Sequence, residues 1–172
     1  MRLLLHFRLP ISIAIVLFAG TFVIATAQAT GVVLNAKDSA RVVPTSFYFE
    51  GQSAPTQIRN SAAARFGPKR HVIAGLVDTS GYSTEVQSKY QGFFITDSAI
   101  TVGGKELGTG AYGFGFSNDG KFNVFDVGGN AVISVGAAKD SALRRPRPLM
   151  MLKDKDELRL YAGRNYVVVA AK

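Results

Sequence analysis

The sequence predicts an all-β domain, a single antiparallel meander that curls into a small sheet or a β-barrel and contains at most one short helix. From Thr30 onward, short apolar stretches alternate with turns rich in Gly, Asn, Asp and Pro. No long stretch has helical periodicity. The chain has 172 residues and no cysteine, so strand pairing and packing must stabilise it without disulfides. We expect roughly eight to ten strands.

The first 29 residues have the pattern of a secretory signal peptide. A basic head precedes an apolar run over residues 11–25, and an Ala-Gln-Ala motif predicts cleavage between Ala29 and Thr30. The apolar run is shorter than the roughly 20 residues of a membrane-spanning helix, although an uncleaved anchor is the alternative. We therefore expect residues 30–172 to be a single exported domain, periplasmic or extracellular, that is not embedded in a membrane.

The predicted mature chain is basic. The first 29 residues hold two Arg and no acid, so 18 Lys and Arg remain against 12 Asp and Glu, a net charge of +6. Such a charge favours anionic partners, but dispersed basic residues are also typical of a solvated surface, and no specific nucleic-acid motif is present. Only Arg144, Arg145 and Arg147 cluster, beside two prolines that favour an extended segment. We interpret this cluster either as a connector or as a contact for an anionic surface or partner.

In the first half of the domain, the pattern predicts two strands and one helix. Residues 57–66 alternate, which places Ile58 on an apolar face and Ala63 on the opposite, mainly polar face of a half-buried strand. Residues 71–77 are almost continuously apolar, as in a strand covered on both faces. The only plausible helix is residues 83–90, which begin with residues that favour a helix start.

The pattern in the second half of the domain predicts a series of β-hairpins. Its expected strands are residues 93–96, 99–102, 105–107, 112–116, 122–127, 131–135, 149–152, 158–161 and 166–170. Gly103-Gly104 is a two-residue link that accepts positive φ and closes a tight hairpin. Because few residues separate most of these strands, we expect neighbours in sequence to pair antiparallel.

One strand has an unusual composition. Tyr112, Phe114 and Phe116 share one face, while Gly113 and Gly115 occupy the other, because strand side chains alternate with period two. The three rings either line a cavity that holds an apolar small molecule or fill an ordinary core. The glycines permit curvature or close contact on their side of the strand.

The segment Leu76-Val77-Asp78-Thr79-Ser80-Gly81 is the strongest catalytic candidate. It resembles the loop of retropepsin-like aspartic proteases, in which a hydrophobic strand delivers an aspartate followed by Thr or Ser and then Gly. The resemblance implies a homodimer in which Asp78 and its copy share one proton and activate water, with Thr79 and Gly81 supporting them. In that family the Gly follows directly, whereas here Ser80 intervenes. The alternative is a polar turn in which Asp78 bonds nearby backbone amides.

Other catalytic patterns are incomplete. Residues 108–113 fit a GxGxxG spacing, but the following residues alternate like a strand and offer no helix N-terminus for a pyrophosphate. One His and no Cys in the mature chain argue against a zinc site, and we expect no metal and no cofactor. The sequence therefore favours a non-catalytic binding or structural β-domain with unknown partners. A retropepsin-like hydrolase that uses Asp78 is the alternative.

Overall fold

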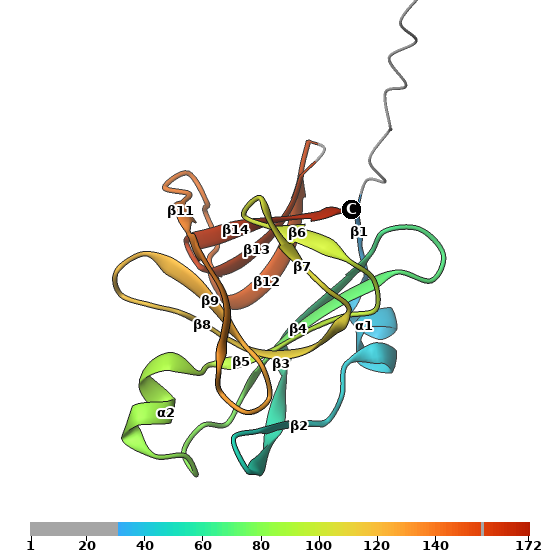
Figure 1. Cartoon of the computed structure of the whole chain (residues 1–172). Coiled ribbons are helices and arrows are strands. Elements are labelled where there is room, and N and C mark those ends of the chain that lie inside the picture. The colour runs from blue at the N-terminus through green and yellow to red at the C-terminus, as the bar shows by residue number, and fades with distance from the viewer. Residues whose placement is uncertain (1–30, 156) are drawn as a thin grey trace, which may run out of the picture.

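The computed structural model describes residues 31–155 and 157–172, which form two antiparallel β-sheets packed face to face (Figure 1). The proposed cleavage site between Ala29 and Thr30 lies outside the described residues. The prediction of antiparallel β-structure is confirmed. The prediction of a single curled sheet or closed barrel is wrong, because the strands of the described residues divide between two sheets and no strand pairing among them joins the two.

The larger sheet has the order β1-β3-β4-β5-β8-β9-β10, with β2 also paired to β3. Its strands are β1 (Val32–Val33), β2 (Ser46–Phe49), β3 (Gln52–Arg65), β4 (His71–Val77), β5 (Gly92–Thr96), β8 (Gly110–Phe116), β9 (Lys121–Phe125) and β10 (Ala131–Gly136). Sequential strands pair where the connecting turns are short, as expected for hairpins.

The smaller sheet has the order β12-β13-β14-β6-β7, with β11 also paired to β14. Its strands are β6 (Ile100–Val102), β7 (Lys105–Leu107), β11 (Ala138–Lys139), β12 (Arg147–Asp154), β13 (Glu157–Gly163) and β14 (Asn165–Ala171). The predicted hairpin is confirmed, since β6 pairs with β7 and Gly103 and Gly104 have φ of 55° and 81°. The described residues contain more strands than predicted, partly because β1, β2 and β11 are short segments paired to longer strands.

Two short helices flank the larger sheet, so the expectation of at most one helix is wrong. α2 (Thr84–Lys89) is the predicted helix, and the Ser83 hydroxyl caps its N-terminus by accepting a hydrogen bond from Val86 N–H. α1 (Ala36–Val42) was not predicted. The sequence feature that marks the start of α1 is the N-cap residue Asn35, whose side-chain oxygen accepts a hydrogen bond from Asp38 N–H at 3.0 Å.

The larger sheet separates two hydrophobic cores. The inner core lies between the sheets, and the outer core lies on the far face of the larger sheet, beneath β2 and α2 (Figure 1). In β4, Val72 and Ala74 enter the inner core, while Ile73 and Val77 enter the outer core. The predicted burial of β4 on both faces is therefore confirmed, and it explains why its sequence is continuously apolar.

The aromatic and glycine faces of β8 also serve these two cores. Phe114 is fully buried in the inner core, and Tyr112 and Phe116 pack against the same core. On the other face, Gly113 lies against the Phe49 ring of the outer core, and Gly115 lies against a backbone carbonyl of α2. The absence of a side chain at these glycines lets the outer core approach the sheet closely.

The predicted alternation holds for residues 62–66, where Ala62, Ala64 and Phe66 enter the inner core, but it fails at a large β-bulge over residues 57–60 of β3. Thr56 pairs with Val77 and Ser61 pairs with Gly75, so residues 57–60 oppose a single residue of β4. Ile58, expected on the buried face, is 44 % exposed, whereas Ala63, expected on the polar face, is fully buried. The bulge takes Ile58 off the buried face, whereas Ala63 is buried because the outer core covers the second face of the strand.

Along one side of the two sheets, β3 and β12 lie next to each other without pairing, and we call this side the seam. On the larger sheet, β1 pairs with only two residues of β3 before the chain turns into α1. On the smaller sheet, β12 is the end strand and pairs only with β13. Leu149 and Met151 of β12 share the inner core with Ala62 of β3, but no β-pairing connects these two strands.

Candidate functional site

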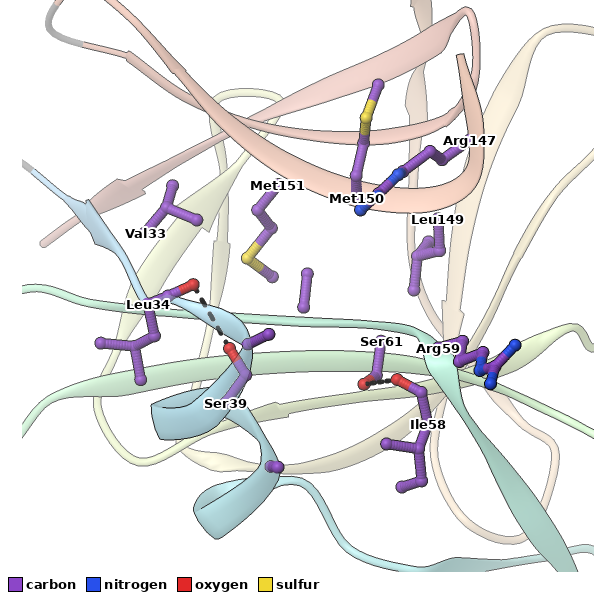
Figure 2. A pocket seen from close by; sticks show the side chains of 13 residues that line it. Val33, Leu34, Ser39, Ile58, Arg59, Ser61, Arg147, Leu149, Met150 and Met151 are labelled. Carbon is purple, nitrogen blue, oxygen red and sulfur yellow. Dashed lines mark hydrogen bonds between the residues drawn. The ribbon is translucent and has the colours of Figure 1, made fainter. Parts of the chain in front are cut away.

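A cavity of about 480 Å³ opens at the seam, between α1, β3 and β12. Its lining residues, which define the seam cavity, are Val33, Leu34, Ala36, Ser39, Ala40, Ile58, Arg59, Ser61, Ala62, Arg147, Leu149, Met150 and Met151. Figure 2 shows that Leu149 and Met151 point from β12 toward α1 and β3, whereas Met150 points away. Most of the lining is apolar, with two serines and two arginines.

Two β-bulges face each other across the seam cavity. The β3 bulge contributes Ile58 and Arg59. A second bulge interrupts β12 between Arg147 and Met150, where β12 has one more residue than β13, and both ends of this segment line the cavity. Bulges redirect side chains and are frequent near functional sites. Here they bring side chains from distant parts of the chain to one opening.

Hydrogen bonds hold the β3 bulge in a defined shape. The Asn60 amide donates to Gln57 Oε1 at 2.8 Å, and the Gln57 amide donates to the Val77 carbonyl at 3.1 Å. The Ser61 hydroxyl donates to the Ile58 carbonyl at 2.6 Å (Figure 2). These contacts satisfy backbone and amide groups that lose their partners in β4, so the bulge is an ordered part of the cavity wall.

Helix α1 contributes to the wall of the seam cavity through small side chains. Ala36 and Ala40 are four residues apart and therefore lie on the same side of the helix. The Ser39 hydroxyl donates to the Leu34 carbonyl at 3.4 Å and so fastens the helix to the preceding segment (Figure 2). The short alanine side chains leave space between α1 and the strands.

The polar side chains of the cavity lining are two serines and two arginines. Neither Asp nor Glu lines it, and neither Arg59 nor Arg147 forms an ion pair within the described part of the chain. Both serine hydroxyls are already donating to backbone carbonyls. The two guanidinium groups are therefore the side-chain donors that remain uncommitted in this lining.

The structure separates the three arginines of the predicted basic cluster. Arg147 begins β12 and lines the seam cavity. Arg144 and Arg145 lie in the segment between β11 and β12 and do not line this cavity. The partner arginine at the seam is instead Arg59, which sequence analysis did not single out because nothing in a regular alternating pattern marks a bulge.

Asp78 lies in a polar turn after β4. Its Oδ1 accepts a hydrogen bond from Ser80 N–H at 3.0 Å, and its own N–H donates to the Pro55 carbonyl. Hydrogen bonds from the Ser80 amide and hydroxyl hold the pKa of Asp78 below its ordinary value. No second carboxyl group contributes to this shift among the described residues, whereas an aspartic dyad needs two.

The other residues of the protease-like motif are not collected at one opening. Asp78 and Gly81 border a cavity of about 210 Å³, while Thr79 borders a different cavity of about 350 Å³. Within one chain, the motif therefore does not surround a common pocket. The proposed dyad between two copies of the chain stays a prediction.

The aromatic residues of β8 pack tightly with their neighbours. The ring centroids of Phe114 and Phe122 are 5.5 Å apart, and those of Phe116 and Phe122 are 4.9 Å apart. None of Tyr112, Phe114 and Phe116 lines the seam cavity. The structure thus places these candidate ligand-binding rings against the inner core.

Residues 31–155 and 157–172 contain no group of three or more His, Cys, Asp and Glu side chains arranged to hold a metal ion. In the same residues, neither helix has the length and apolar character needed to cross a membrane. Comparison with known proteins finds no matching family model, no matching curated protein and no matching solved structure.

Proposed function

We propose that this chain is an exported, non-catalytic binding domain whose ligand occupies the seam cavity. The observation that carries the proposal is the pair of arginines without acidic partners, Arg59 and Arg147, that two bulges bring to one opening among apolar side chains. Ligand cavities of about 300–1,000 Å³ typically combine apolar lining with a few polar groups that orient the ligand. The seam cavity has this size and combines apolar side chains with two arginines and two serines.

The hydroxyl groups in the lining support binding rather than catalysis. A serine nucleophile requires a neighbouring base that takes its proton. The hydroxyls of Ser39 and Ser61 instead donate to backbone carbonyls, and none of the described residues that line the cavity is a His or a carboxylate that could act as a base. The arrangement can recognise a ligand through apolar contact and guanidinium donors.

Filling the cavity tests this proposal. Ala40 lines the cavity from α1 and is exposed, so Ala40→Trp adds a large ring there without opening either core. The exposed Lys37 lies on the same helix but does not line the cavity, which makes Lys37→Trp the matched control. The fluorescence of 8-anilinonaphthalene-1-sulfonate reports binding to apolar sites. We expect wild type and the control to enhance it and Ala40→Trp to lose most of the enhancement.

Two results would contradict the proposal. One is equal enhancement by wild type and Ala40→Trp, which would place dye binding elsewhere. The other is no enhancement by any of the three proteins. Circular dichroism before titration verifies that each variant retains β-structure, so a loss of binding is not mistaken for a loss of fold.

Export is the second part of the proposal, and the signal-peptide pattern of residues 1–29 supports it. We expect a bacterial host to deliver the protein beyond the cytoplasmic membrane with Thr30 as its first residue. Intact-mass measurement of the periplasmic and culture fractions checks this expectation. Recovery of the uncleaved chain alone, attached to the membrane, would favour the anchor interpretation.

The alternative function is a retropepsin-like aspartic hydrolase that uses Asp78 in a homodimer. Its support is the motif of residues 76–81 and the exposure of the Asp78 carboxylate, which a second copy can approach. This alternative requires two Asp78 carboxylates within hydrogen-bonding distance. It is distinguished from the binding proposal by the dependence of peptide hydrolysis on Asp78.

A further inference from the structure

We infer that the seam cavity takes an amphipathic anion, specifically a medium-length acyl carboxylate whose chain lies along the seam and whose carboxylate meets Arg59 and Arg147. This inference rests on the proposed function, because it names the ligand class of the same cavity. Three features carry it: the elongated path of the lining, the separation of charged and apolar ends, and the identity of the free donors.

The lining follows the strands for several residues. On β12 it extends from Arg147 to Met151, and four residue steps in a strand span roughly 13 Å. On the larger sheet it extends from Ile58 in β3 to Val33, which pairs with Ala64 near the end of that strand. A cavity that follows two strand edges suits a linear chain.

The two ends of this path differ in chemistry. The two arginines come from the two bulges, and Figure 2 shows Val33 and Leu34 on the other side of the opening, with Met151 between these residues and Arg147. Methionine is flexible and polarisable, so Met151 adapts readily to an apolar chain. A ligand that matches both ends has a charged head and an apolar tail.

The head must be an acceptor with negative charge. The guanidinium groups of Arg59 and Arg147 have no carboxylate partner within the described residues, and no acid in the lining would repel an anion. Guanidinium presents donors in a planar fork that fits a carboxylate. A cationic amphiphile of the same length meets two like charges instead, and a neutral alcohol gains no ion pair.

Equilibrium dialysis with radiolabelled decanoate, decanol and decyltrimethylammonium, each below its micelle concentration, tests this inference. We expect wild type to bind decanoate about tenfold more tightly than decanol, and the cation most weakly. The double variant Arg59→Gln/Arg147→Gln is expected to bind decanoate about tenfold more weakly while its affinity for decanol stays unchanged. Raising the salt concentration should reduce the preference for decanoate.

The control variant Arg144→Gln/Arg145→Gln removes the same charge from residues outside the cavity lining. It should bind decanoate like wild type. An equal loss in both double variants would show that net charge, and not the cavity, attracts the anion, and would overturn the inference. The decanoate affinities of the two double variants can be compared if both variants melt like wild type, because both are then folded.

The remaining outcomes separate the two proposals. Equal binding of decanoate and decanol, blocked by Ala40→Trp, would refute the anionic ligand class but leave the binding cavity standing. No binding of any probe would contradict both. A third outcome is that the protein binds anionic lipid vesicles, that Ala40→Trp does not change this binding, and that monomeric decanoate does not bind. It would show that the protein binds anions at its surface and not in the cavity, and would overturn both proposals.

Discussion

Replacing Gly113 by Ala tests the close approach of the outer core to β8. A Cβ atom at this position would lie 2.7 Å from Cδ2 and 3.1 Å from Cζ of Phe49. Carbon atoms in packed interiors are normally about 3.5–4.0 Å apart. The new methyl group therefore requires the Phe49 ring to move.

The neighbours of Phe49 oppose that movement. Its ring stacks on Tyr90 with centroids 4.0 Å apart, and it meets Phe125 edge-on at 6.4 Å. Phe49 and Tyr90 are fully buried. Overpacking a rigid core costs about 1–3 kcal/mol, and the fixed rings place this substitution in the upper half of that range. The loss corresponds to a melting temperature lower by roughly 5–10 °C in a chain of this size.

Urea denaturation and thermal melting, both followed by circular dichroism, measure the effect. Gly136→Ala is the matched control, because Gly136 lies in β10 and a Cβ there would contact nothing within 4 Å. The control should change the free energy of unfolding by less than about 0.5 kcal/mol. If Gly113→Ala is as stable as this control, the packing of Phe49 against β8 is not as tight as we argue.

Three further predictions concern the α1 cap and two turns. Asn35→Ala should lower the free energy of unfolding in urea by about 1 kcal/mol, because Asp38 N–H loses its acceptor, and an unchanged midpoint would contradict this role. Hydrogen bonds from the Asn130 side chain and backbone lower the pKa of Asp126 from 3.8. The Asp126 carboxylate thus binds a proton more weakly in the folded state than in the unfolded chain. The stabilisation that its hydrogen bonds give the folded state is complete above pH 3.8 and is lost as the pH falls through the lowered pKa. Asp126→Asn should be less stable than wild type at neutral pH and converge with it in strong acid, whereas a constant difference in denaturation across this range would refute the linkage. Finally, the binding proposal expects wild type and Asp78→Asn to show the same rate of peptide hydrolysis, and activity that disappears in the variant would favour the aspartic hydrolase.

Sequence patterns predicted the elements whose signals are local. The continuous apolar run of β4, the Gly103-Gly104 hairpin and the alternation of aromatic and glycine residues in β8 all appear in the structure as expected. In each case, side-chain periodicity or turn chemistry acts over a few neighbouring residues. The sequence signal of the Asn35 cap is also local: an Asn followed three residues later by Asp indicates the start of α1.

Bulges and the seam cavity could not be predicted in this way. The pattern around Ile58 is compatible with a regular strand, and only its pairing with β4 shows that residues 57–60 face a single partner. Arg147 was singled out as part of a basic cluster, but its neighbours in that cluster lie elsewhere and Arg59 is 88 positions away in the chain. Register between distant strands decides such contacts.

By itself, the sequence determined the class of this protein: a β-rich chain without disulfides, with hairpins at its glycine turns and a signal-like first segment. These properties follow from composition and from interactions between near neighbours. Only the tertiary structure decided that the strands form two sheets, that the larger sheet carries a core on each face, and that the seam between β3 and β12 stays open. The reason is that the opening depends on the two bulges and on the early end of β1. These features arise from pairing and packing between segments that are far apart in the sequence.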